Sequence, residues 1–386
     1  MKISNASSVM ELEDRYQLNV YAKLPLVVDR GEGCYVFDQQ GRRFLDLYAG
    51  HAVTSTGHCH PKVVDAVSRQ LRELIFYSNA TYSTVRGRAL EKLIQFCEPY
   101  HQAFLVNSGA EANENAIKLA RALTGRSEVI SCQGSFHGRT YGSLSATGIS
   151  HYREYLNTPV PSHRVLPAPS IPEQISETTA AVLVEPIQSM GGVVVIPVEV
   201  LQAIEQACRN KGALLIFDEI QTGVGRTGGT FLYSQKIGIR PDLTSLAKGI
   251  ASGYPAAALL VSSELASQVS KGDLGSTFGG NPAACAAILA TLSVLEEENL
   301  LENVTEVSQY LSQQLAAVPR LKEVRGEGFL IGISLHGQTA KAVQKSLFEQ
   351  GILAGTSYDP EVLRLMPALT LGRAEVDRFV GGMLSI

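Results

Sequence analysis

The apolar residues of this chain follow two alternating patterns. Over residues 61–74 and 84–96 they recur at the spacing of one helix face, which predicts two amphipathic helices. Short uninterrupted apolar runs, typical of buried strands, lie at residues 103–106, 128–131, 181–184 and 214–217. Because helical stretches separate these runs, we expect an α/β fold with a mostly parallel sheet flanked by helices.

The two ends of the chain carry a different, mixed pattern. Strand-like runs punctuated by glycine turns predict a small antiparallel element within residues 26–37. Near the C-terminal end, the predicted helices and strands are 283–298, 302–318, 329–335, 339–350 and 362–365. We therefore predict a large domain over residues 47–281 and a smaller α+β domain built from both chain ends, residues 1–46 and 282–386.

Composition narrows the possible functions. The chain has 386 residues, 45% of them hydrophobic, and a net charge of −4 without a basic run, so we expect no nucleic-acid partner. It has no signal-peptide core and no apolar stretch of about 18 residues, so we expect no membrane association. Its six cysteines show no C-x-x-C spacing, which indicates reduced thiols and a cytoplasmic location.

An acid and a lysine follow two of the predicted strands. The run 214–217 ends on Asp218-Glu219, and a later run, 242–247, is followed by Lys248. Ligands of open α/β sheets bind at the carboxyl ends of strands. One arrangement uses both groups: the Lys248 amine forms a Schiff base with pyridoxal phosphate (PLP), and the Asp218 carboxylate keeps the pyridine nitrogen protonated.

Other interpretations of these residues stay open. A lysine is more often solvated than catalytic, and Asp218-Glu219 could cap a strand or bind a metal. The run Gly223–Gly228 matches the G-x-G-x-x-G pattern of dinucleotide-binding proteins. That motif should open a helix, whereas residues 229–233 look like loop or strand, so we consider it a weak match.

Three further stretches fit a PLP site. Residues 106–111 leave a strand and enter a helix, so the backbone N–H groups at this helix start could bind a phosphate, although Ser108 could be a simple N-cap. In the loop 135–139, Phe136 could stack on a planar cofactor and Arg139 could bind a carboxylate. The glycine-rich loop 276–282 could approach a phosphate or only connect two elements.

Seven ordered stretches together resemble the class III (ω-amino-acid) PLP-dependent aminotransferases of the type I aspartate aminotransferase fold. Within that family the chain is most similar to the acetylornithine aminotransferases, over almost its whole length. The matching stretches are Gly57–Pro61, Asn107–Asn113, Phe136–Thr140, Val184–Gln188, Phe217–Gly223, Leu246–Gly249 and Ser276–Pro282.

The resemblance implies a role for each cofactor-binding residue. Lys248 would bind PLP covalently and later move the proton between the substrate carbon and the cofactor. Asp218 would pair with the pyridine nitrogen, Gln221 would hydrogen-bond the phenolic oxygen, and Phe136 would stack on the ring. The phosphate would be held by Ser108, Gly109 and Ala110.

The resemblance also implies substrates and a homodimer. Thr277 would reach the phosphate in the neighbouring subunit, with Ser276 near the substrate there. Arg139 would bind the α-carboxylate of N-acetylornithine, and Arg364 that of glutamate or 2-oxoglutarate. The implied reaction converts N-acetylornithine and 2-oxoglutarate to N-acetylglutamate semialdehyde and glutamate, in arginine biosynthesis and with no metal ion.

Related activities are alternatives. A sister enzyme could act on succinylornithine, on carrier-linked lysine or aminoadipate semialdehyde, or on 4-aminobutyrate. A PLP aminomutase or racemase would use the same scaffold without a keto acid. A nucleotide-binding protein using Gly223–Gly228 and a catalytically silent relative are the alternatives from other functional classes.

One position departs from the family pattern. After Glu185–Gln188 the family usually continues Gly-Glu-Gly-Gly, and that glutamate pairs with the second arginine. Here the run is Ser189-Met190-Gly191-Gly192. Without a carboxylate at position 190, we expect Arg364 to keep its charge exposed in both half-reactions and to orient α-amino acids as readily as ω-amino acids.

Overall fold

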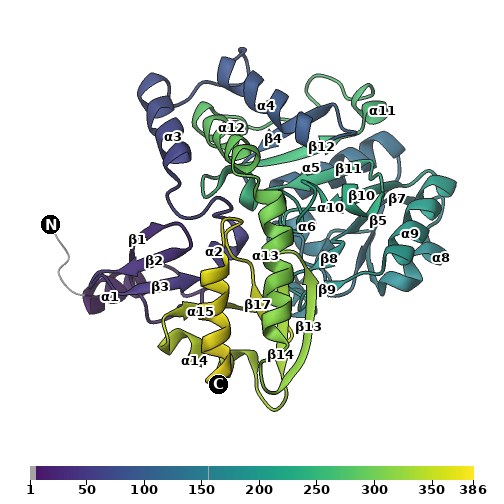
Figure 1. Ribbon diagram of the computed structural model, residues 1–386. Coiled ribbons are helices and arrows are strands. Elements are labelled where there is room, and N and C mark those ends of the chain that lie inside the picture. The colour runs from purple at the N-terminus through teal and green to yellow at the C-terminus, as the bar shows by residue number, and fades with distance from the viewer. Residues whose placement is uncertain (1–5, 155) are drawn as a thin grey trace.

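A seven-stranded sheet forms the centre of the protein, and the computed structural model describes residues 6–154 and 156–386 (Figure 1). The first five residues of the predicted segment 1–46 lie outside this range. The strand order is β4-β12-β11-β10-β7-β5-β6, and only β12 is antiparallel to its neighbours, which confirms the predicted mostly parallel sheet. The strands are β4 (Gln102–Val106), β5 (Glu128–Cys132), β6 (His163–Leu166), β7 (Thr179–Val184), β10 (Leu214–Asp218), β11 (Leu243–Leu246) and β12 (Ala257–Val261).

Helices cover both faces of this sheet, as the uninterrupted apolar strands require. On the central strand β10, Ile216 lies in the apolar cluster of α5 (Gly109–Thr124), whereas its neighbours Leu215 and Phe217 lie in the cluster of α9 (Val198–Lys211). Successive side chains of a strand point to opposite faces, so β10 is buried from both sides. The carboxyl end of β10 therefore lies between the helix layer of α5 and that of α9.

A second layer of helices lies beside the strand β4 edge. The predicted helices 61–74 and 84–96 are α3 (Pro61–Glu73) and α4 (Thr84–Phe96), and both pack against α12 (Pro282–Glu297). Asn281 caps α12 by accepting a hydrogen bond from the Ala284 N–H at 2.9 Å. Across residues 6–154 and 156–386, no helix is both long and apolar enough to cross a lipid bilayer.

The two chain ends meet in smaller sheets (Figure 1). One joins β1 (Val28–Glu32), β2 (Tyr35–Asp38) and β3 (Arg43–Asp46) with β15 (Ile352–Leu353), which pairs parallel with β3. This pairing confirms the predicted smaller α+β unit built from both chain ends, while the exact limits at residues 46 and 281 stay predictions. The second sheet has the order β13 (Leu321–Glu327), β14 (Leu330–Leu335), β17 (Leu363–Leu365) and β16 (Gly355–Thr356).

The remaining elements surround these sheets. The longer helices are α1 (Ala6–Tyr16), α13 (Leu300–Leu315), α14 (Ala340–Glu349) and α15 (Arg373–Leu384). The short helices are α2 (Ala49–Ala52), α6 (Tyr141–Ala146), α7 (Ser150–Arg153), η1 (Ala168–Ser170), α8 (Ile171–Gln174), α10 (Tyr233–Ile237), η2 (Lys248–Ala251) and α11 (Ser263–Ala266). Two short strands, β8 (Ile187–Gln188) and β9 (Val194–Val195), form a hairpin.

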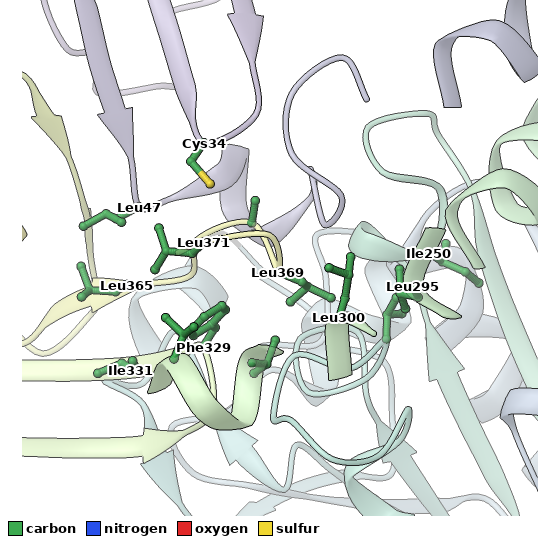
Figure 2. Packing of buried hydrophobic residues seen from close by; sticks show 14 of the residues in the cluster. Cys34, Leu47, Ile250, Leu295, Leu300, Phe329, Ile331, Leu365, Leu369 and Leu371 are labelled. Carbon is green, nitrogen blue, oxygen red and sulfur yellow. The ribbon is translucent and has the colours of Figure 1, made fainter. Parts of the chain in front are cut away.

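One hydrophobic core connects the small sheets to the large one. Figure 2 shows Cys34 and Leu47 from the N-terminal end beside Leu365 and Leu371 from the C-terminal end. The same cluster extends to Ile250, two residues after Lys248. The segment that carries this lysine, η2, packs against α12 and α2.

We predict that the Phe329→Ala substitution in this core lowers the free energy of unfolding by about 3–5 kcal/mol, because it leaves a cavity. Phe329 is 0% exposed. Leu384→Ala is the matched control, since Leu384 is 50% exposed and its truncation should cost less than about 1 kcal/mol. Urea unfolding measures both variants, and equal losses would contradict this description of the core.

Candidate active site

The Asp218 carboxylate is fixed at the carboxyl end of β10. Its Oδ2 accepts hydrogen bonds from Asn113 Nδ2 at 2.7 Å and from His137 Nδ1 at 2.8 Å, and its Oδ1 accepts one from the Ile220 N–H at 3.1 Å. Asp218 is only 3% exposed. Because a buried carboxylate needs such donors, the three hydrogen bonds fix both its position and its orientation.

Lys248 lies at the carboxyl end of the neighbouring strand β11, at the start of η2. Its backbone has a φ of 48°, and Ser55 Oγ donates a 2.6 Å hydrogen bond to the carbonyl of the next residue, Gly249. Burial lowers the pKa of the Lys248 amine, while the negative charges of Asp218 and Glu185 partly oppose this shift. The amine is therefore more easily deprotonated than an ordinary lysine.

Glu185 is a second buried acid, at the carboxyl end of β7. Its Oε1 accepts a hydrogen bond from the Phe136 N–H, and its Oε2 accepts one from the Ser189 N–H at 3.3 Å. Burial raises the pKa of Glu185 to about 7; His137 opposes this shift and the charge of Asp218 adds to it. The sequence interpretation gave this residue no role.

The start of α5 presents backbone amides toward the same region. Ser108 is the N-cap, because its Oγ accepts a hydrogen bond from the Glu111 N–H at 3.2 Å. A Cβ on Gly109 would lie 2.5 Å from Cδ1 of Ile220, so only glycine fits here without displacing that side chain. This close packing brings the first amides of α5 up to the segment that follows Asp218.

A cavity of about 460 Å³ brings most of the predicted site residues together. Its walls also include Glu185, Ser189 and Met190. The predicted site residues that line it are Ser108, Gly109, Ala110, Phe136, Arg139, Asp218, Gln221 and Lys248. These eight residues come from four separate segments, and the charged groups Glu185, Asp218 and Lys248 follow the carboxyl ends of β7, β10 and β11.

Three predicted residues lie outside the lining of this cavity. Ser276 and Thr277 belong to an exposed loop, in which Ser276 Oγ accepts a 3.3 Å hydrogen bond from Asn107 Nδ2. Arg364, on β17, is only 1% exposed to solvent. It lies behind the cavity wall, where Nη1 donates to Ser189 Oγ at 2.8 Å.

Arg364 has only neutral partners among the described residues. Besides Ser189, its Nε donates to the Thr356 carbonyl at 2.8 Å, and no carboxylate lies within ion-pair distance in the part of the chain described. Burial lowers the pKa of Arg364, although the nearby phenols of Tyr48 and Tyr152 oppose the shift. The absence of an acidic partner agrees with Met190 standing in the cavity wall.

The glycine run 223–228 has a structural explanation. A Cβ on Gly225 would lie 2.2 Å from Leu301 of α13, and one on Gly228 would lie 2.8 Å from Oγ1 of Thr305. The following helix, α10, begins only at Tyr233. These glycines let the loop pack against α13, so the weak dinucleotide-binding match has a packing cause.

Comparisons with known proteins agree with this geometry. The sequence profile of the family described as "Aminotransferase class-III" matches residues 16–386. The chain belongs to the class III aminotransferases. It is 39% identical over 383 residues to an acetylornithine aminotransferase of Methanothermobacter thermautotrophicus, covering 97% of each chain. It is 42% identical to one of Archaeoglobus fulgidus, covering 97% of this chain and 99% of that one.

A solved structure of an aminotransferase with PLP is similar over the full chain. The ornithine aminotransferase of Toxoplasma gondii, whose active site holds PLP at partial occupancy, superposes with a TM-score of 0.93 at 30% identity. The comparison covers 100% of this chain and 95% of that one. This chain is accordingly a PLP-dependent aminotransferase.

The pocket of this aminotransferase fits that cofactor. Oε1 of Gln221 is buried and has no hydrogen-bond partner in the described residues, as expected for a group that awaits a ligand donor. The fixed Asp218 carboxylate, the amides at the start of α5 and the Lys248 amine line one cavity, and they are groups of the kinds that would hold the ring nitrogen, the phosphate and the aldehyde of PLP.

Two further residues of the aminotransferase site were in the matched sequence stretches but had no assigned role. Asn113 and His137 both donate to Asp218, and Asn113 also donates to the His137 carbonyl at 2.8 Å. Asn113 lies four residues, or about one helical turn, after Gly109 at the start of α5. This spacing is the only sequence feature that could have placed its side chain on the face that carries Gly109. The packing of the loop around His137 depends on tertiary contacts.

We predict that Glu185→Gln stabilises the cofactor-free aminotransferase more as pH rises. A raised folded pKa means that deprotonation of Glu185 penalises the folded state; the penalty grows between about pH 4.5 and about pH 7 and is constant above. Glutamine keeps an acceptor for the Phe136 N–H but does not titrate. The variant's gain in unfolding free energy should grow by on the order of 2 kcal/mol from about pH 5 to about pH 8. A gain independent of pH would contradict the assignment.

Proposed function

We propose that this aminotransferase transfers the terminal amino group of N-acetylornithine to 2-oxoglutarate, giving N-acetylglutamate semialdehyde and glutamate, a step of arginine biosynthesis. The observation that carries the proposal is the pair of arginines around the Lys248 pocket, Arg139 in its wall and Arg364 behind Ser189. Two cations suit a reaction whose donor carries a carboxylate and whose acceptor carries two. The acetylornithine aminotransferases at 39% and 42% identity support an acetyl group on the α-nitrogen of the ornithine donor.

Within this proposal each cofactor-binding residue has one task. Lys248 binds PLP covalently through its amine, and Asp218 pairs with the pyridine nitrogen. Gln221, whose buried Oε1 has no partner among the described residues, hydrogen-bonds the phenolic oxygen of the ring. Phe136 stacks on the ring. The phosphate is held by Ser108, Gly109 and Ala110.

The chemistry divides between the cofactor and the chain. PLP, when bound, supplies a ring that accepts the electron pair released when the donor loses the proton next to its nitrogen. Lys248 takes that proton and returns it, which its lowered pKa favours because the free amine is the base. Asn113 and His137 hold the Asp218 carboxylate so that its charge stays directed at one position.

The two arginines bind the carboxylates. Arg139 takes the α-carboxylate of N-acetylornithine, which leaves the terminal amine free to reach the reacting position. Arg364 takes the α-carboxylate of glutamate or 2-oxoglutarate. Since Ser189 and Thr356 are neutral partners, no acidic group competes with the substrate for the Arg364 guanidinium among the described residues.

A homodimer with shared sites is part of the proposal. Ser276 and Thr277 lie outside the cavity of their own chain, which supports a role at the phosphate and substrate of a second subunit. A groove of about 1030 Å³ between α3, α4 and α12, lined in part by Leu74, Tyr77 and Tyr82, provides apolar surface for that subunit. The six free thiols support the cytoplasm as its location.

Lys248→Ala should lower kcat for transamination by about 10⁴-fold or more, because the variant lacks the group that carries the proton. PLP should still bind to this variant non-covalently. Asp218→Ala should also lose most activity. The assay follows glutamate formation from N-acetylornithine and 2-oxoglutarate. Near-normal turnover by either variant would contradict these roles, and wild-type turnover of succinylornithine but not N-acetylornithine would change the proposed substrate.

A second activity follows from Met190. Because no carboxylate of the described residues pairs with Arg364, we expect efficient turnover of α-amino acids beside the ω-amino donor. Met190→Glu should raise the ratio of ω- to α-amine turnover by about tenfold, through pairing of the new carboxylate with Arg364. Met190→Gln is the uncharged control. An unchanged ratio in Met190→Glu would refute the role of this position.

A further inference from the structure

Arg139 presents an unpaired cation to the active-site cavity. Its side chain is exposed, and in residues 6–154 and 156–386 no acceptor or carboxylate contacts its guanidinium. Its contacts are two aromatic rings: Cζ lies 4.0 Å from the centroid of Tyr152 and 5.5 Å from that of Phe136. The five N–H donors of the group therefore remain available, while its position depends on these rings.

Tyr152 is fixed relative to the loop that carries Arg139. The N–H groups of Gly148 and Ile149 both donate to the carbonyl of Ser135, at 2.8 and 3.2 Å, and the Tyr152 N–H donates to the Ile149 carbonyl at 3.2 Å. The Tyr152 ring meets Phe136 edge to face, with centroids 5.3 Å apart and an interplanar angle of 76°. One aromatic ring thus supports both the predicted stacking residue and the arginine.

An unsupported arginine would bind a carboxylate less well. Its long side chain has several rotamers, and fixing one of them on binding costs conformational entropy. A ring that already holds the guanidinium over the cavity removes part of that cost before the substrate arrives. The ring contact is therefore expected to matter for ligands that use Arg139, whereas the effect of the Tyr152 phenol on Arg364 is common to all α-keto acids that Arg364 binds.

We infer that Tyr152 is a positioning residue for substrate carboxylates: its ring holds the Arg139 guanidinium in the wall of the pocket, and so favours substrates that carry a carboxylate for Arg139 to bind. The inference rests on the proposed function. Tyr152 acts through Arg139 and takes no part in proton transfer.

The choice of acceptor substrate distinguishes the contribution of Arg139 from that of Arg364. In 2-oxoglutarate, one carboxylate is next to the reacting carbonyl and belongs to Arg364, so the second one lies at the Arg139 end. In 2-oxopentanoate a methyl group replaces that second carboxylate. The ratio of kcat/KM for these two acceptors therefore reports on the Arg139 end and cancels effects on folding, on PLP and on Arg364.

The test compares three variants of the PLP-loaded enzyme. Tyr152→Leu removes the ring, and should lower the 2-oxoglutarate to 2-oxopentanoate ratio of kcat/KM by about three- to fivefold, the size of a partly exposed cation–π contact. Tyr152→Phe keeps the ring and should restore the wild-type ratio. Tyr310→Leu is the matched control, since it removes another arginine contact, Arg373 over Tyr310 at 5.1 Å, outside the residues that line the cavity.

Each outcome decides the inference. A reduced ratio in Tyr152→Leu, restored in Tyr152→Phe and unchanged in Tyr310→Leu, supports it. An unchanged ratio in Tyr152→Leu, or a Tyr152→Phe variant as impaired as Tyr152→Leu, would overturn it while leaving the proposed function intact. Wild-type enzyme that does not aminate 2-oxoglutarate would overturn both.

Discussion

The burial of one carboxylate, Asp218, determines how the rest of the site is built. A negative charge at the end of a central strand is unfavourable unless donors surround it. Asn113 from α5 and His137 from the loop after β5 supply these donors on one oxygen, and the Ile220 N–H supplies one on the other. Helix, loop and strand are thereby held in one arrangement around a charge that points into the cavity.

The charge of Asp218 influences the pKa values of the neighbouring titratable groups. Glu185 is buried and Lys248 partly buried beside it; burial lowers the pKa of the lysine and raises that of the glutamic acid to about 7, which favours the neutral form of each. Arg364 adds a cation that has no acidic partner in the part of the chain that the structure describes. The site therefore combines one carboxylate held by protein hydrogen-bond donors, two groups whose neutral forms burial favours, and one buried guanidinium, which suits a reaction that moves a proton and binds carboxylates.

Much of this arrangement follows from local sequence. The apolar runs that became β7 and β10 indicate buried strands, and the acids directly after them lie at the same sheet edge as Lys248, which follows β11. The helix α5 was predictable from its serine cap and its apolar stripe, with Gly125 at its end. Local patterns of this kind depend on few distant contacts.

Other features depend on contacts between distant segments. The antiparallel strand β12 enters the sheet between β4 and β11, an order that periodicity does not encode. The sequence did not indicate that Arg364 is buried, with Ser189 of the β8–β9 region against its guanidinium. Tyr152 lies in a four-residue helix with no sequence signal, and only the folded chain brings its ring onto Arg139.

The most direct test of this account is the near-ultraviolet and visible absorption spectrum of the purified protein, before and after N-acetylornithine is added without a keto acid. The chain contains no tryptophan, so bound PLP stands out clearly. The account predicts that the band of lysine-bound PLP gives way to that of the aminated cofactor, and that 2-oxoglutarate restores it. A protein that shows no such band after PLP is supplied, or a band that no amino donor changes, would contradict the account.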